Sequence, residues 1–260
     1  NARAIALANA QIANHNVGYN PFSNPALLGF TNKNEYGFSY IPMSLDRYIQ
    51  SLSITIPVPP TAAIGISLFM SGTNDIPRTT STGDYIEDYS AWEGMGIVSF
   101  GVSANSLSVG INIKILKNEI DDFSATGLAG DIGILYQISS KNSVALLFKN
   151  ITGKYSWDFK YGGSQYLYDE DFPFIASIGS SSYINKKILL LNQIDYILDN
   201  KNLTYRTGIE IDLYDEREKI PLYFRFGFHN QNKVSNYSVG FGYVAKFKNN
   251  LNFGIDYALD

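Results

Sequence analysis

The sequence contains few of the residues that proteins use for chemistry. Its 260 residues include no cysteine and only 2 histidines, so disulfides and thiol chemistry are excluded. Charged residues make up 17% of the chain, against roughly a quarter in a typical soluble protein. The net charge of −4 gives no sign of a nucleic-acid partner. No run of about 18 apolar residues occurs, so no transmembrane helix is predicted.

Tyrosine, phenylalanine and glycine are abundant instead, with 19, 16 and 22 copies. The stretch from Asn105 to Ile138 shows how they are arranged. Aliphatic side chains alternate there with Gly, Ser, Asn, Asp and Lys, which is the period of a β-strand. A soluble sandwich would carry more Lys, Glu and Thr on its polar face. A small polar face suits a crowded, wet interior and an aliphatic face suits lipid, so the pattern predicts a transmembrane antiparallel β-barrel.

Similar alternation continues from Glu35 to Leu259 and gives about thirteen strands. Single-chain bacterial barrels have even strand numbers, so we expect about fourteen strands, with the last one missing from this chain. Two long polar segments, 71–93 and 152–171, are interpreted as loops. They follow odd-numbered strands, whereas short turns follow even-numbered ones. Long loops outside and short turns inside are typical of the bacterial outer membrane.

Residues 1–33 do not alternate and are expected to form a helical or irregular plug that lies against or inside the barrel of residues 34–260. The segment opens on the Ala-rich run NARAIALANA, without the basic region of a signal peptide, so a processed or trimmed chain is expected. An Asn24-Pro25 step follows, and a residue before proline is excluded from helical conformation. A turn cap is therefore expected at Asn24, Pro25 and Ala26; the alternative, a hatch, is what the family resemblance described next implies.

The residues quoted so far resemble the PorV/PorQ family of outer-membrane barrels. NARAIALANA followed by NPALLGF resembles the family's leader. LSVGINIKIL with IDDFSATGLAGDIGILYQ resembles its central signature, and YSVGFGYVAKFKNNLNFGIDYAL its last strands. The resemblance covers essentially the whole chain and places it among FadL-like barrels, which usually have fourteen strands and an N-terminal plug. Ala8-Asn9-Ala10 departs from the family by replacing a Gly-rich step.

The resemblance implies two functions of different kinds. PorV-like members accompany the channel of type IX secretion, so the first is a non-enzymatic subunit that binds a large secretion barrel, exported cargo or another assembly subunit. FadL-like members pass long-chain fatty acids or other apolar molecules, so the second is a transporter with a hydrophobic ligand in its lumen. A structural subunit of a larger assembly is a third possibility. In each case the expected surroundings are outer-membrane lipid.

No catalytic constellation stands out, and neither an enzyme activity nor a cofactor or metal is expected. Charges on the small polar faces are the first candidate site, interpreted as ion pairs that hold the plug and close the barrel rather than as the lining of a solute path. They are Lys114, Asp131, Arg206, Glu210, Asp212 and Arg225. The second candidate is a partner-binding outer loop with the aromatic anchors Tyr85, Tyr89 and Trp92.

Overall fold

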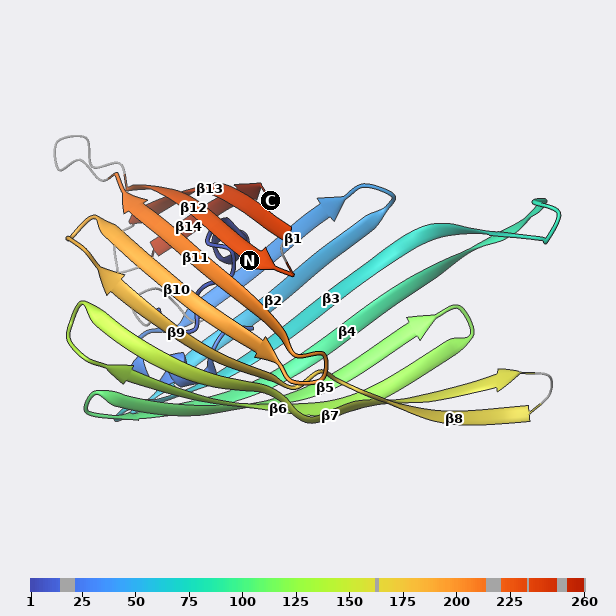
Figure 1. Ribbon diagram of the computed structural model, residues 1–260, viewed down its shortest axis with the longest axis horizontal. Helices are drawn as coiled ribbons and strands as arrows, with labels where there is room; N and C mark the ends of the chain where they lie inside the picture. Colours follow the sequence, from blue (N-terminus) through green and yellow to red (C-terminus); the bar gives the residue numbers. More distant parts are fainter. Residues whose placement is uncertain (15–21, 162–163, 214–220, 233, 247–251, 260) are drawn as a thin grey trace.

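The chain folds into one antiparallel sheet that curves around an N-terminal segment (Figure 1). The computed structural model describes residues 1–14, 22–161, 164–213, 221–232, 234–246 and 252–259. The strands are β1 (Glu35–Met43), β2 (Arg47–Val58), β3 (Ala62–Thr79), β4 (Tyr85–Ala104), β5 (Leu107–Ile120), β6 (Phe123–Gln137), β7 (Asn142–Tyr161), β8 (Ser164–Asp171), β9 (Ile175–Tyr183), β10 (Ile188–Ile197), β11 (Asn202–Asp212), β12 (Leu222–Gln231), β13 (Val234–Lys246) and β14 (Asn252–Leu259).

The sheet contains the fourteen strands expected for the barrel, but their identities differ from the expectation. Thirteen strands follow one another along the wall, and β8 pairs with β7 alone. Among the described strands, β1 and β14 stand at the two ends of this path. The further closing strand remains a prediction.

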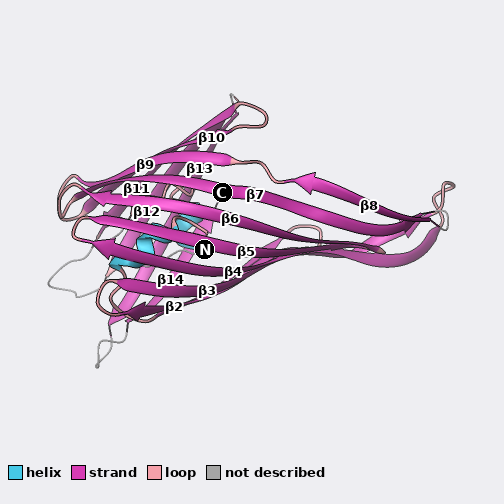
Figure 2. Ribbon diagram, turned by 90° about the horizontal axis from the view of Figure 1, so that it is seen from below, coloured by secondary structure: helices cyan, strands magenta, loops and turns pink. Residues whose placement is uncertain are grey.

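The two segments interpreted as long polar loops, 71–93 and 152–171, are mostly strand. β3 and β4 stay paired as far as Thr79 and Tyr85, and β7 pairs with β8 from Lys154 to Tyr161. Both hairpins project far beyond the wall (Figure 2). The interpretation was wrong because a strand outside lipid needs no apolar face, so hydrophobic alternation does not reveal it.

The outer face of the wall is apolar and the inner face is closely packed. On β5 the residues alternate strictly between exposed and buried from Leu107 to Leu116. The exposed members are the aliphatic ones predicted to face lipid: Leu107, Val109, Ile111, Ile113 and Ile115. A belt of exposed aliphatic and aromatic side chains continues around the strands, far more than a surface in water usually presents.

The N-terminal residues lie inside this sheet, and we call residues 1–14 and 22–33 the inner segment (Figure 2). It contains the α-helix α1 (Ala2–Ala6) and the 3-10 helix η1 (Pro25–Phe30). α1 contacts β12, β13 and β14, while η1 contacts β3, β4, β5 and β6. In the described part of the chain, neither these helices nor any other is long and apolar enough to cross a membrane.

The apolar belt predicts where an arginine is tolerated on β5. Ile111 and Ile120 are similarly exposed, at 46% and 40%. Ile111 lies within the belt, whereas Ile120 is the last residue of β5, beside the turn at 121–122. In lipid vesicles, Ile111→Arg should lower the free energy of unfolding by about 2–4 kcal/mol and Ile120→Arg by about 0–1 kcal/mol. Denaturant titration of both variants measures the difference, and equal losses would contradict a lipid-facing belt.

Candidate functional site

The inner segment lies directly against the backbone of the wall, and glycines make this approach possible. A Cβ on Gly101 of β4 would lie 2.6 Å from Leu28 Cβ and 2.7 Å from the Pro25 carbonyl oxygen. On the opposite wall, a Cβ on Gly240 would lie 2.5 Å from Ala6 Cβ. Atoms do not approach so closely, so these positions have no room for a side chain. The small inward faces predicted from the sequence therefore accommodate closely packed protein.

Asn24, Pro25 and Ala26 lie at the centre of this contact. The Asn24 carboxamide accepts a hydrogen bond from the Ala26 amide (2.9 Å) and so caps η1. Its amide nitrogen donates to the Ile12 carbonyl (3.0 Å), which ties the two halves of the inner segment together. Ser108 of β5 donates its hydroxyl proton to the Ala26 carbonyl (2.6 Å). The Asn-Pro-Ala step thus caps a turn and also contacts the wall.

A chain of ion pairs joins the other end of the inner segment to the wall. Arg3 makes a bidentate pair with Glu210 of β11, with N···O distances of 2.8 and 2.9 Å. Glu210 also accepts from Arg225 of β12 at 2.6 Å, and Arg225 reaches Asp256 of β14 at 2.5 Å. Arg3, Glu210 and Arg225 are all buried. Because the carboxylate of Glu210 lies between two guanidinium groups, it connects the segment with the wall.

The remaining predicted charges form two further clusters. Lys114 pairs with Asp131 at 2.7 Å, and Asp131 also accepts from Asn112 at 2.9 Å. Arg206 pairs with Asp195 at 2.7 Å and donates to the Ala8 carbonyl at 3.1 Å, a second bond from wall to segment. Asp212 ends β11 and is half-buried.

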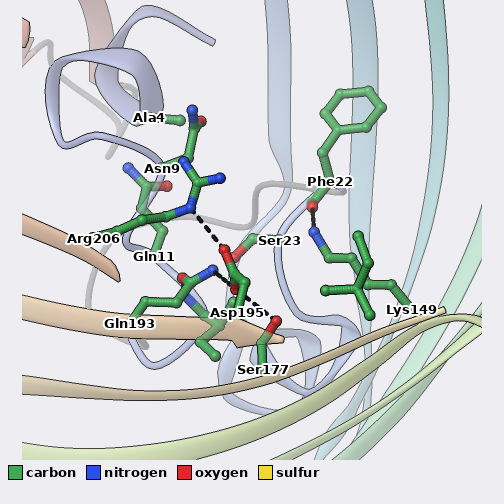
Figure 3. Close-up of a pocket in the computed structure, with 12 residues that line it drawn as sticks. Ala4, Asn9, Gln11, Phe22, Ser23, Lys149, Ser177, Gln193, Asp195 and Arg206 are labelled. Atoms are coloured by element: carbon green, nitrogen blue, oxygen red, sulfur yellow. Dashed lines mark hydrogen bonds and ion pairs between the residues drawn. The ribbon is translucent and has the colours of Figure 1, made fainter. Parts of the chain in front are cut away.

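A cavity of about 220 Å³ lies between the inner segment and the wall of β7, β9, β10 and β11 (Figure 3). Its lining is mixed, with polar groups from both sides. The Lys149 ammonium donates to the Phe22 carbonyl at 3.0 Å on one side of it. The lining residues are Ala4, Asn9, Gln11, Ile12, Phe22, Ser23, Lys149, Ile175, Ser177, Gln193, Asp195 and Arg206.

Sequence reasoning missed Arg3, Lys149 and Gln11. Arg3 carried a signal, because it is the lone arginine or lysine before Lys33 in an otherwise small and apolar run. Lys149 and Gln11 carried none, since an isolated polar residue beside a strand or in an irregular segment has no distinctive context.

The predicted partner-binding aromatics lie on β4 instead of a loop. Tyr85 and Tyr89 are in the projecting hairpin, with the Arg78 guanidinium 5.6 Å from the Tyr89 ring. Trp92 donates its indole N–H to Glu119 at 2.8 Å, and Lys117 lies over its ring. Tyr85 is the most exposed of the three.

Neither a family model nor a curated protein sequence matches the chain. Solved structures do match. The Pseudomonas putida toluene transporter TodX gives a TM-score of 0.63 at 13% identity, over 97% of this chain and 91% of that chain. A TodX deltaS2S3 mutant, described as a monoaromatic hydrocarbon channel, gives 0.56 at 14% identity, over 91% and 87%. The similarity shows that the chain shares its fold with these proteins. None of these matches bears on the PorV/PorQ resemblance, which remains a prediction.

The glycine contacts predict that one added methyl group disturbs the inner segment. Gly101→Ala should lower the free energy of unfolding by about 1–3 kcal/mol, because the methyl overlaps backbone and Leu28. Gly96→Ala is the matched control on the same strand, since its Cβ would lie 3.8 Å from the nearest atom, Leu68 Cδ2. Denaturant titration in detergent compares them, and a loss no larger for Gly101→Ala than for Gly96→Ala would argue against the close contact.

Proposed function

We propose that the chain forms a channel for small solutes in the bacterial outer membrane, with the inner segment as a plug that closes its lumen. The contact of the inner segment with both sides of the wall carries this proposal. The fold shared with a toluene transporter supports it. The apolar outer belt supports a membrane location. This favours transport over the secretion role as the primary function.

Arg3 is the residue through which closure is best tested. Breaking a buried ion pair usually leaves an uncompensated charge in the interior. Here Glu210 keeps its bond to Arg225 when Arg3 is replaced, so the wall retains its own ion pair. Removal of Arg3 therefore weakens the attachment of the plug without leaving Glu210 alone.

Arg3→Gln should raise solute flux. In planar bilayers the variant is expected to show frequent openings, with a mean conductance about tenfold above the wild-type protein, as for loss of a contact of about 1.4 kcal/mol. Arg78→Gln is the control, because Arg78 is likewise an ion-paired arginine, bound to Glu87 and Asp121, but it lies in the projecting hairpin. Equal conductance in Arg3→Gln, Arg78→Gln and wild type would contradict a closing role for the inner segment.

A second candidate function is a partner-binding subunit of the PorV/PorQ kind. The projecting strands favour it through their charge. Residues 74–93, 116–122 and 154–171 contain twelve acidic and four basic residues, a net charge of −8 in a chain of net −4. Hydrogen bonds from Ser156 and Lys154 hold the pKa of the Asp169 carboxyl below its usual value, so this acid stays ionised. An acidic surface with exposed tyrosines fits a partner with a basic surface.

Tyr85 tests this second candidate. Tyr85→Ser should reduce co-purification of a basic partner from native membranes by about tenfold, as for a hot-spot residue. Tyr237→Ser is the matched control, since both tyrosines are 62% exposed. Raised salt should release the same partner because the attraction is electrostatic. Recovery that is insensitive to Tyr85 and to salt would exclude this surface.

A further inference from the structure

We propose that the cavity between the inner segment and β7, β9, β10 and β11 binds a small anionic solute. This inference deepens the proposed channel function, on which it rests for the route of the solute, by naming the solute class. It concerns the chemistry of the lining, which differs from that of a site for a hydrocarbon.

Lys149 is the first observation. Its side chain comes from β7 and lines the cavity, partly exposed to it (Figure 3). Its ammonium group donates a hydrogen bond to a neutral acceptor, the Phe22 carbonyl oxygen. In the part of the chain that the structure describes, no carboxylate forms an ion pair with it. A cation inside a protein is costly unless an opposite charge lies beside it, so this ammonium group is open to an anion.

Asp195, the one carboxylate among the described lining residues, does not pair with Lys149. Both Asp195 oxygens are already used: Oδ1 accepts from Ser177 at 2.6 Å and Gln193 at 2.7 Å, and Oδ2 accepts from Arg206 at 2.7 Å. Arg206 also balances the charge of Asp195. Of the two basic residues that line the cavity, Arg206 pairs with Asp195 and Lys149 has no ion-pair partner among the described residues.

The other charged groups near Lys149 lead to the same conclusion. They are Lys114, Asp131, Asp195 and Arg206, of which Lys114 and Asp131 pair with each other. Arg206 and Asp195 also pair with each other, so within this set Lys149 is the group that has no ion-pair partner among the described residues. A neutral hydrocarbon in the cavity would leave Lys149 without such a partner.

Two buried polar side chains of the inner segment complete the site. Gln11 and Ser23 line the cavity and are 7% and 6% exposed. The Gln11 amide nitrogen and the Ser23 hydroxyl have no hydrogen-bond partner among the residues that the structure describes. Buried polar groups are nearly always hydrogen-bonded, so both are explained by a ligand with acceptor atoms. An ammonium, an amide N–H and a hydroxyl are together a donor set for a carboxylate or a phosphate.

The size of the cavity limits the ligand. At about 220 Å³ it is smaller than pockets for drug-sized ligands, which have roughly 300–1,000 Å³. A short organic acid or an inorganic anion fits this volume better than a long acyl chain.

Isothermal titration calorimetry of the full chain in detergent, with benzoate, toluene and inorganic phosphate as probes, tests the proposal. Benzoate and toluene share a ring and differ in charge. Benzoate should bind at least about tenfold more tightly than toluene, and Lys149→Met should weaken it by at least about tenfold. Lys154→Met, an exposed lysine further along β7, should leave binding unchanged. Gln11→Leu should also weaken it, which keeps the test valid if Lys149→Met fails to fold.

The phosphate arm distinguishes the two sources of the anion. Displacement of benzoate by phosphate supports a site that binds anions by their charge alone. Lack of displacement supports a site whose ligand is an organic carboxylate. Toluene binding as tightly as benzoate, no binding of any anion, or equal behaviour of Lys149→Met and Lys154→Met would overturn the proposal. Failure of the channel function would appear separately, as unchanged conductance of Arg3→Gln.

Discussion

Close approach between the inner segment and the wall is the constraint on which the rest of the structure depends. A sheet that presents aliphatic side chains outward has every second residue pointing inward, and those residues must leave room for the inner segment. Glycine, serine and alanine do so. Their small size brings Leu28 and Pro25 within contact of the β4 backbone, and Ala6 within contact of β13. Burial of the segment's apolar residues, such as Leu7 and Leu28, follows from this fit.

Ion pairs and hydrogen bonds also hold the inner segment against the wall. The side chains at the Ala-rich start of the chain are too small to bind the wall strongly. Arg3 is the exception, because it forms an ion pair with Glu210. Arg206 adds a bond to the Ala8 carbonyl. These contacts come from β11 and extend through Arg225 of β12 to Asp256 of β14, so they tie several strands to one segment. Of the charges that the sequence analysis interpreted as interior ion pairs, Glu210 and Arg206 bond directly to the inner segment. The cavity between the segment and the wall differs, because Lys149 lines it and pairs with no carboxylate of the described residues, while Asp195 there pairs with Arg206.

Strands could be predicted from the sequence where contact with lipid requires an apolar residue at every second position. Inside the belt, the alternation on β5 and β6 predicted both the strands and their exposed faces. Beyond it, Tyr85, Tyr89 and Trp92 lie on a strand that polar composition had suggested was a loop. Pairing of inward charges could be anticipated, since buried charges need partners. Which charges pair could not, because the Arg3 and Glu210 contact spans 207 positions and depends on register and on the path of the inner segment.

Labelling of a single cysteine tests the central claim most directly, because the natural chain has none. Ala26→Cys places a thiol at a fully buried position of the inner segment, and Thr80→Cys places one at an exposed hairpin turn. Reaction with a water-soluble maleimide should be at least about a hundredfold slower at Ala26→Cys than at Thr80→Cys in the folded protein, and equal after unfolding, since reactivity follows thiol access. Equal rates in the folded protein would show that the inner segment does not lie within the sheet, and would contradict the account.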